Sequence, residues 1–457
     1  MKRHKHQAGQ NLSAARDPLR HGPGRRFLAL AVGIAAALVA AAPLGAAHAQ
    51  AAFPLAPPPA GPPTAIVGAS LVDVERGIVV PNAVVVITGD RISASGPASA
   101  VSVPDGAAIV RLDGQWLIPG LINSHVHLGN RLPGAAGAAL ANETPSHQIL
   151  RMAQAARRAL ESGVTTVRIT GAENGNDFDL KRAINAGYAI GPRIETAGQV
   201  IVPNGGHGNR EADGPAEFAK AAREQIKNGA SWIKISISGG IADMHGDIAA
   251  SPMMRDELKT VIEVAHRNGV KVTAHNGSPI AADDAIAEGV DGFEHGYFLG
   301  RKQLLAMKEK GVWLVPTIGV SQASIMEFFK RQGMPEWYMA RVRSVSKSHW
   351  AMLQEAIRVG NKIAMGTDQN PAEPNEGTTA SIRELEMYVD AGMTPLASLR
   401  TATSAAAEML GLSADIGSLS PGRFADILAV RQNPLETIGA LRTISFVMKG
   451  GQIVRKD

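Results

Sequence analysis

The stretch Trp116–Gly129 reads WLIPGLINSHVHLG, and the rest of the chain is interpreted outward from it. Its apolar first part is typical of a short buried strand, which ends in His125 and His127. Side chains two residues apart on a strand leave the same face. The two imidazoles therefore point to one place, where they can hold a metal ion. An isolated pair of this kind fits two packed core histidines at least as well, so the decision depends on the other residues.

The composition indicates a globular α/β protein. The chain has 457 residues, of which 45% are hydrophobic and 19% charged, and it contains 49 glycines. It contains no cysteine, so disulfides and thiolate metal sites are excluded. A metal in this protein would bind to histidine, to carboxylate or to a modified lysine.

The first 49 residues are predicted to be a secretory signal peptide. A basic region precedes the apolar run Phe27–Leu44, and Ala47–Ala49 is a small-x-small cleavage site before Gln50. The predicted localisation is therefore periplasmic or secreted. The pair Arg25-Arg26 leaves both twin-arginine and ordinary Sec export open, and an uncleaved anchor is a third alternative.

The leader accounts for the basic charge of the chain. It carries seven basic side chains and one acidic one, whereas the whole chain has a net charge of +5, so the mature part is close to −1. No basic patch with interleaved aromatic residues occurs in the sequence. We expect no nucleic-acid partner and no stable membrane span after cleavage.

Both ends of the mature chain show a β pattern. The Pro-rich linker 50–63 precedes short strand-like runs in residues 64–115, and similar runs return in residues 412–457. The predicted runs are Ala65–Val72, Ala83–Thr88, Arg91–Ser95, Ala108–Leu112, Asp426–Val430 and Ser445–Val454. We expect the two ends to form one small β domain.

Residues 116–411 alternate short apolar runs with helical patterns, which predicts a (β/α)8 TIM barrel. The eight runs are Trp116–His125, Thr165–Thr170, Arg193–Val202, Trp232–Ser238, Lys271–His275, Gly292–His295, Trp313–Thr317 and Lys362–Thr367. Helical patterns cover His147–Ser162, Phe178–Ala186, Pro215–Lys227, Met253–Asn268, Ile280–Glu288, Arg301–Lys310, Ser321–Val359 and Ser381–Val389. The long seventh connection has room for two or three helices beside the barrel mouth.

Further candidate ligands stand in these runs. His275, His295 and Asp368 end the fifth, sixth and eighth runs, where a barrel presents side chains to its mouth. Lys234 lies within the fourth, apolar run, where a charged ammonium would be costly. A buried lysine with a lowered pKa can react with CO2 to give a carbamate, whose two oxygens can bridge two ions. Taken alone, Lys234 is equally well explained by a salt bridge to an acidic residue of the barrel. Asp368 alone is equally well explained as a helix cap.

With these residues in view, the chain resembles the metal-dependent amidohydrolase superfamily. The similarity runs from Gly68 to the C-terminus and includes WLIPGLINSHVHL, Lys234, the GTD that ends in Asp368, and SLSPGRFADILAV. The segments IKISISGG, AHN and EHGY resemble the imidazolonepropionase-like and Xaa-Pro-dipeptidase-like branch. This branch also contains ochratoxinase-like carboxypeptidases.

The resemblance implies a two-metal site, usually of zinc. His125, His127 and Asp368 would hold the more buried ion, and His275 and His295 the more exposed one. Carboxylated Lys234 and a hydroxide would bridge the ions. Asp368 would also serve as the catalytic acid and base, taking a proton from the hydroxide and returning it to the leaving nitrogen.

The resemblance also suggests substrate-binding residues. His207 lies in PNGGHGN after the third run, and Tyr297 lies two residues past His295. In the dipeptidase-like relatives a histidine and a tyrosine at matching positions bind the terminal carboxylate of the substrate. The alternative for His207 is an exposed side chain in a flexible glycine-rich turn.

The predicted function is hydrolysis of the amide bond of a dipeptide or N-acyl amino acid with a free carboxylate, ochratoxin-type amides included. Alternatives are hydrolysis of a cyclic amide or lactone, and a non-catalytic assembly protein on the same scaffold. Deamination is disfavoured, because deaminating relatives usually use one metal and lack the bridging lysine. A homo-oligomer is expected.

Overall fold

The structure, a computed structural model, describes residues 61–457. The predicted signal peptide and nearly all of the predicted linker lie outside these residues. Within residues 61–457, no helix is long and apolar enough to cross a membrane.

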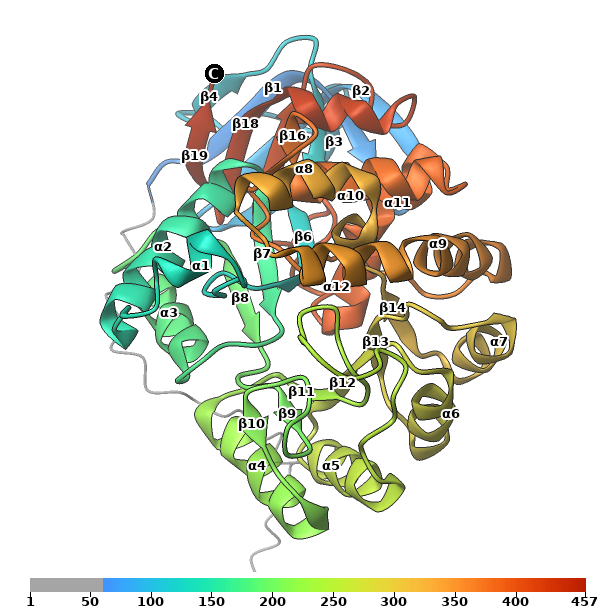
Figure 1. Cartoon of the computed structure of the whole chain (residues 1–457). Coiled ribbons are helices and arrows are strands. Elements are labelled where there is room, and N and C mark those ends of the chain that lie inside the picture. The colour runs from blue at the N-terminus through green and yellow to red at the C-terminus, as the bar shows by residue number, and fades with distance from the viewer. Residues whose placement is uncertain (1–60) are drawn as a thin grey trace, which may run out of the picture. The chain divides into compact units, whose positions relative to one another are not determined.

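One sheet joins the two ends of the described chain (Figure 1). Its strand order is β19-β18-β17-β5-β1-β2-β3, and β4 pairs with β1 beside this path. The strands are β1 (Thr64–Asp73), β2 (Ile78–Thr88), β3 (Arg91–Pro97), β4 (Ala108–Arg111), β5 (Trp116–Pro119), β17 (Ile427–Val430), β18 (Ile444–Lys449) and β19 (Gln452–Lys456). The sheet has its own apolar core, in which Ile66, Leu117 and Phe446 are fully buried. The predicted β domain from both ends is confirmed.

Eight parallel segments make the barrel, which confirms the predicted fold. Seven of them contain the strands β6 (Leu121–Val126), β7 (Val164–Ile169), β8 (Arg193–Thr196), β11 (Trp232–Ser236), β12 (Lys271–Asn276), β13 (Gly292–His295) and β14 (Trp313–Val315). The amide of Ser231 donates to the Thr196 carbonyl at 2.9 Å and joins β8 to β11. The eighth segment bridges to β14 at Ile363, and the Ser124 amide donates to the Met365 carbonyl at 2.7 Å. This last bond closes the ring.

The helices follow the strands in the predicted order. They are α1 (Ala135–Ala138), α2 (Pro145–Glu161), α3 (Asn176–Asn185), α4 (Gly214–Asn228), α5 (Arg255–Arg267), α6 (Pro279–Glu288), α7 (Arg301–Lys310), α8 (Ala323–Arg331), α9 (Glu336–Val359), α10 (Ala380–Asp390), α11 (Pro395–Thr401) and α12 (Ser404–Leu410), with 3-10 turns η1 (Ile318–Ser321) and η2 (Ile438–Thr443). The seventh connection folds as η1, α8 and α9, as the sequence suggested. Short pairs β9 (Ile201–Val202) with β10 (Arg210–Glu211) and β15 (Pro374–Asn375) with β16 (Thr378–Thr379) lie in loops.

The first predicted run is divided between two sheets, so the prediction of one strand over Trp116–His125 was wrong. Residues of β5 pair with β1 and β17, and the barrel begins only at Leu121. Pro119 has no amide hydrogen and cannot extend a ladder on that side. Gly120 passes so close to Thr165 that a Cβ would lie 2.1 Å from its Oγ1. The Pro-Gly pair therefore carries the chain from one sheet to the other.

The third predicted run is also divided. It forms β8 and then β9, which pairs with β11. Gly198 separates them with a φ of +67°, a left-handed conformation that glycine adopts without strain. A side chain there would also meet Gln225 and Phe178. The continuous apolar pattern concealed this bend.

Candidate metal centre and active-site cavity

The end of β6 brings two imidazoles together. The Nε2 atoms of His125 and His127 are 3.2 Å apart, and each lies 3.1 Å from Oδ1 of Asp368. His127 Nδ1 donates to the carbonyl of Gly171 at 3.0 Å. His125 Nδ1 lies 2.7 Å from Oε2 of Glu294 and donates to that carboxylate. Because Nδ1 of each ring is engaged by Glu294 or Gly171, both Nε2 atoms are directed at the Asp368 oxygen.

Asp368 reaches this point through the closure of the barrel. Its amide donates to the carbonyl of His125 at 2.9 Å, and its backbone has a φ of +54°. Gly366 is needed two residues earlier, because a Cβ there would lie 2.6 Å from the Cβ of His125. The end of the eighth segment is therefore fixed against the end of β6.

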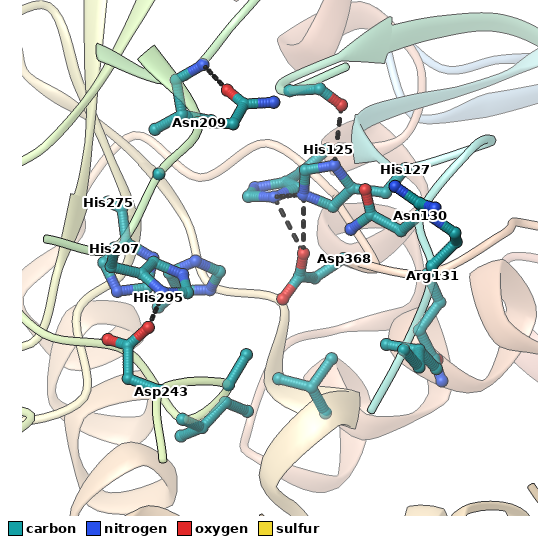
Figure 2. A pocket seen from close by; sticks show the side chains of 18 of the residues that line it. His125, His127, Asn130, Arg131, His207, Asn209, Asp243, His275, His295 and Asp368 are labelled. Carbon is teal, nitrogen blue, oxygen red and sulfur yellow. Dashed lines mark hydrogen bonds and ion pairs between the residues drawn. The ribbon is translucent and has the colours of Figure 1, made fainter. Parts of the chain in front are cut away.

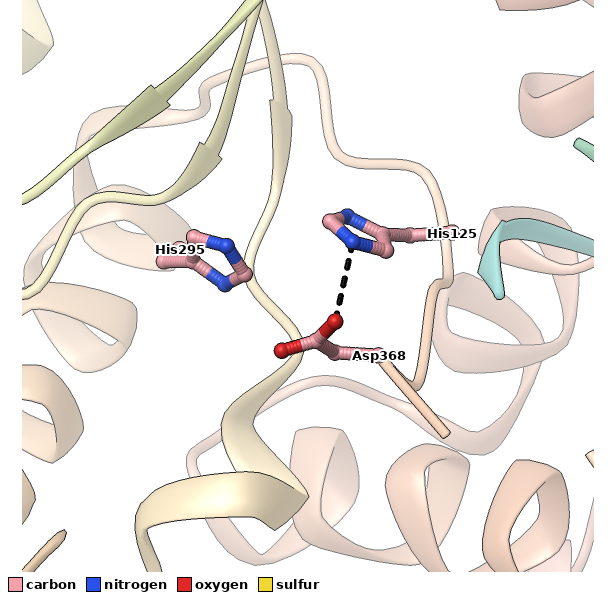
Figure 3. A group of neighbouring side chains, drawn as sticks. All are labelled: His125, His295 and Asp368. Atoms are coloured by element: carbon pink, nitrogen blue, oxygen red, sulfur yellow. Dashed lines mark ion pairs between the residues drawn. The ribbon is translucent and has the colours of Figure 1, made fainter. Parts of the chain in front are cut away.

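A second histidine pair lies beside the first. His275 and His295 have ring centroids 4.5 Å apart, and His295 forms with His125 and Asp368 a group whose ligand atoms are all within 4.8 Å of one another (Figure 3). His275 Nε2 donates to the carbonyl of Gly239 at 3.1 Å, and His295 Nδ1 lies 2.7 Å from Oγ1 of Thr317. These contacts leave Nδ1 of His275 and Nε2 of His295 for a ligand.

The surroundings of His275, His295 and Asp368 keep these side chains in the protonation states that bind a metal ion. Burial lowers the pKa of His275 and of His295 well below the usual range, so both rings are neutral. Burial alone would raise the pKa of Asp368, but the neighbouring His125 and His127 hold it well below its ordinary value. Neutral imidazoles and an ionised carboxylate are the states that bind metal.

Lys234 on β11 is buried, and it lines the same active-site cavity as the four histidines and Asp368. Burial lowers its pKa to about 8, while the charges of Glu294 and Asp368 act in the opposite direction. Near neutral pH, a larger fraction of Lys234 than of an exposed lysine is therefore uncharged. A neutral amine is the form that reacts with CO2.

A buried ion pair supports the first pair of histidines. Glu294 on β13 contacts Nη2 of Arg168 and Oγ1 of Thr273, both at 2.5 Å, and accepts a hydrogen bond from Nδ1 of His125. Burial would raise the pKa of Glu294, but Arg168 and His125 hold it below its usual range. The ionised carboxylate fixes the tautomer and the plane of His125. The sequence analysis missed this group, although Glu294 directly precedes His295.

A further histidine, His349, supports the backbone near His295 and was not singled out by the sequence patterns. It is fully buried on α9, and its Nε2 lies 3.1 Å from the His295 carbonyl and 2.9 Å from the Pro316 carbonyl. It therefore fixes the backbone around His295. Helical periodicity alone gave no signal for this contact, because it joins residues 54 positions apart.

The four candidate histidine ligands, Lys234 and Asp368 line a cavity of about 360 Å³ (Figure 2). The candidate substrate-binding residues lie there as well. His207 is about a quarter exposed, and its Nδ1 lies 2.8 Å from Oδ1 of Asp243. Tyr297 is fully buried and stacks on His295 with ring centroids 5.2 Å apart. Its hydroxyl has no hydrogen-bond partner among the described residues. An unpaired buried hydroxyl is costly and is satisfied by a ligand that can bond to it.

Residues 116–454 match the model of the amidohydrolase family. The chain belongs to the amidohydrolase family. The match covers the barrel and the C-terminal strands, and the paired histidines, Lys234 and Asp368 fall within it.

Relatives with assigned activities are similar over most of this amidohydrolase. Ochratoxinase of Aspergillus niger is 29% identical over 74% of this chain and 75% of its own. Its crystal structure has a TM-score of 0.76 and 27% identity, covering 87% of this chain and 96% of that one. A Xaa-Pro dipeptidase with methionine in its active site has a TM-score of 0.78 and 28% identity, covering 86% and 100%. Together with the family match, these relatives make the chain a hydrolase that acts on amide bonds.

Proposed function

We propose that the chain is a two-metal hydrolase that cleaves the amide bond of a dipeptide or an N-acyl amino acid with a free carboxylate. The observation that carries this proposal is the convergence of His125 Nε2, His127 Nε2 and Asp368 Oδ1 at 3.1 to 3.2 Å. The Nδ1 atoms of both rings are engaged by Glu294 and Gly171, so the two Nε2 atoms are directed at Asp368. Three nitrogen and oxygen atoms that converge at this spacing suit a bound cation.

The spacing fits a divalent ion. Ligands of tetrahedral zinc at about 2.0–2.1 Å from the metal are separated from one another by about 3.3 Å. His125, His127 and Asp368 would hold the more buried ion, and His275 and His295 the other. Carboxylated Lys234 would bridge them. All donors are nitrogen or oxygen, which suits zinc in the absence of cysteine. When bound, two such ions would supply an activated water molecule and a polarised amide carbonyl.

The side chains of the protein supply proton transfer and support. The carboxylate of Asp368 accepts the proton of the attacking water and gives it to the departing amide nitrogen. Glu294 keeps His125 oriented throughout, and Thr317 does the same for His295. The reaction releases an amine and a carboxylic acid.

The carboxylate end of the substrate is assigned to His207 and Tyr297. The Tyr297 hydroxyl is buried and unpaired, so a carboxylate oxygen that accepts its proton removes the cost of burying it. Asp243 accepts a hydrogen bond from Nδ1 of His207. The Nε2 atom is left for the substrate, and it donates to a carboxylate when the ring is protonated. The ochratoxinase and Xaa-Pro dipeptidase relatives support this substrate class.

The first prediction tests this assignment with matched substrates. Tyr297→Phe and His207→Ala should lower kcat/KM for substrates with a free carboxylate much more than for the same compounds with an amidated terminus. Each lost charge-assisted hydrogen bond is worth about 1.5–3 kcal/mol. Steady-state kinetics on a dipeptide, an N-acyl amino acid and their amides measures the difference. Equal losses on both forms would show that these residues do not bind the carboxylate.

A further inference from the structure

Four carboxylates line the active-site cavity, and three of them have a partner. Asp368 contacts His125 and His127, and Asp243 contacts His207. Glu173 forms an ion pair with Arg131 at 2.8 Å. The fourth carboxylate is that of Glu373, and among the described residues no basic side chain forms an ion pair with it.

Two backbone hydrogen bonds position Glu373. Its amide donates to the carbonyl of Asn370 at 2.9 Å, and its own carbonyl accepts from the amide of Ala380 at 2.7 Å, where α10 begins. The side chain is partly buried in the cavity wall, and this burial raises the pKa of its carboxyl to about 7. A partly buried carboxylate without a cation is costly, so an arriving cation gains more there than at an exposed site.

The place of Glu373 in the barrel relates it to the substrate. Glu373 follows Asp368 by five residues in the loop after the eighth segment, whereas His207 and Asp243 belong to loops after the third and fourth. Strands that follow one another around an eight-stranded ring place these loops on opposite sides of its mouth. Figure 2 shows Asp368 between His207 with Asp243 on one side and His127 on the other. A substrate whose carboxylate lies at His207 therefore extends its acyl part toward the loop of Glu373.

We propose that Glu373 binds the free amino group of the substrate's acyl residue, so that the enzyme prefers unblocked dipeptides to N-acyl amino acids. This inference rests on the proposed function and chooses between its two substrate classes. The ammonium of a dipeptide lies on the acyl side of the scissile bond, opposite its carboxylate. Glu373 would thus recognise one end of the dipeptide, and His207 with Tyr297 the other.

The test compares a dipeptide with its counterpart in which hydrogen replaces the amino group. Wild-type protein should show a kcat/KM at least about 10-fold higher for the dipeptide, the worth of one charge-assisted hydrogen bond. Glu373→Gln should lower the dipeptide value by about that factor and leave the counterpart unchanged. Glu376→Gln is the matched control, because Glu376 lies in the same loop, pairs with Arg383 at 2.8 Å and does not line the cavity. It should keep the wild-type ratio.

Equal loss on both compounds in Glu373→Gln, or a wild-type ratio near one, would overturn the proposal. Calorimetric binding of a phosphinic pseudodipeptide, with and without its amino group, separates this result from failure of the proposed function. An amine preference that disappears in Glu373→Gln supports the subsite even where no amide is cleaved. Equal binding of the two phosphinic compounds to wild-type protein overturns it whatever the hydrolytic activity.

Discussion

Asp368 has two proposed tasks, metal binding and proton transfer, which one substitution can separate. Asparagine keeps an oxygen at the position of Oδ1 but cannot accept a proton at neutral pH. We predict that Asp368→Asn, loaded to two ions per chain, turns over about 10²–10⁴-fold more slowly than wild type. The measurement is kcat with metal content determined on the same sample. Near-wild-type turnover at full occupancy would leave Asp368 as a ligand only.

Single residues differ in how well the sequence predicts them. His125, His127, His275, His295 and Asp368 each end an apolar run, so the rule that barrels present side chains at strand ends placed them together. Glu294, Thr317 and His349 act through neighbours on other elements, and Glu373 reaches the cavity from the loop before α10. Their contacts arise only when distant segments pack, so no local pattern in the sequence could indicate them.

Helix α10 connects to the candidate metal centre through Glu384. This fully buried carboxyl accepts from the amides of Ile318 and Gly319 at 2.7 and 2.8 Å and so fixes the turn that follows Thr317. Thr317 in turn contacts His295, and its backbone has a φ of +49°. The contact between Glu384 and this turn therefore helps to orient His295, a candidate metal ligand.

Glu384 also gives a prediction for stability. Burial raises its pKa to about 8 despite the two amide donors. In the unfolded chain the pKa is about 4.3. Between these values the unfolded chain has released the proton and the folded chain retains it, so stability that is present at low pH is lost as pH rises toward 8. The wild type should therefore lose stability relative to Glu384→Gln from pH 5 to pH 8, by at most about 1.4 kcal/mol per pH unit.

The measurement is the urea concentration at half unfolding for both proteins at several pH values. The lost hydrogen bond in Glu384→Gln shifts the difference by a constant, so only the slope against pH matters. A difference that does not change with pH would mean that Glu384 is ionised in the folded protein, held by the two amides.

The division of Trp116–Gly129 into β5 and β6 shows a limit of pattern reading at this scale. Both halves are apolar and buried, so periodicity does not distinguish them. The division depends on Pro119 and Gly120 and on the contact of Gly120 with Thr165, which belongs to another strand. The same holds for Gly198 between β8 and β9.

At the scale of the whole molecule, the order of the elements was predictable. Alternation of strands and helices determined the barrel, and the two β-patterned ends determined the second sheet. The sequence could not give the pairing of charges in the cavity. Within residues 61–457, that pairing leaves Glu373 without a basic partner and the Tyr297 hydroxyl without a hydrogen-bond partner, and the proposals about the substrate rest on both.

The central claim, a two-metal centre that hydrolyses amides, is tested most directly by titrating metal into the chelated protein and measuring dipeptide hydrolysis at each addition. We predict that activity is absent without metal and rises until about two divalent ions are bound per chain. Lys234→Ala, which lacks the proposed bridge, should bind fewer ions and remain inactive. Full activity without metal or at one ion per chain, or full occupancy and activity in Lys234→Ala, would contradict the account.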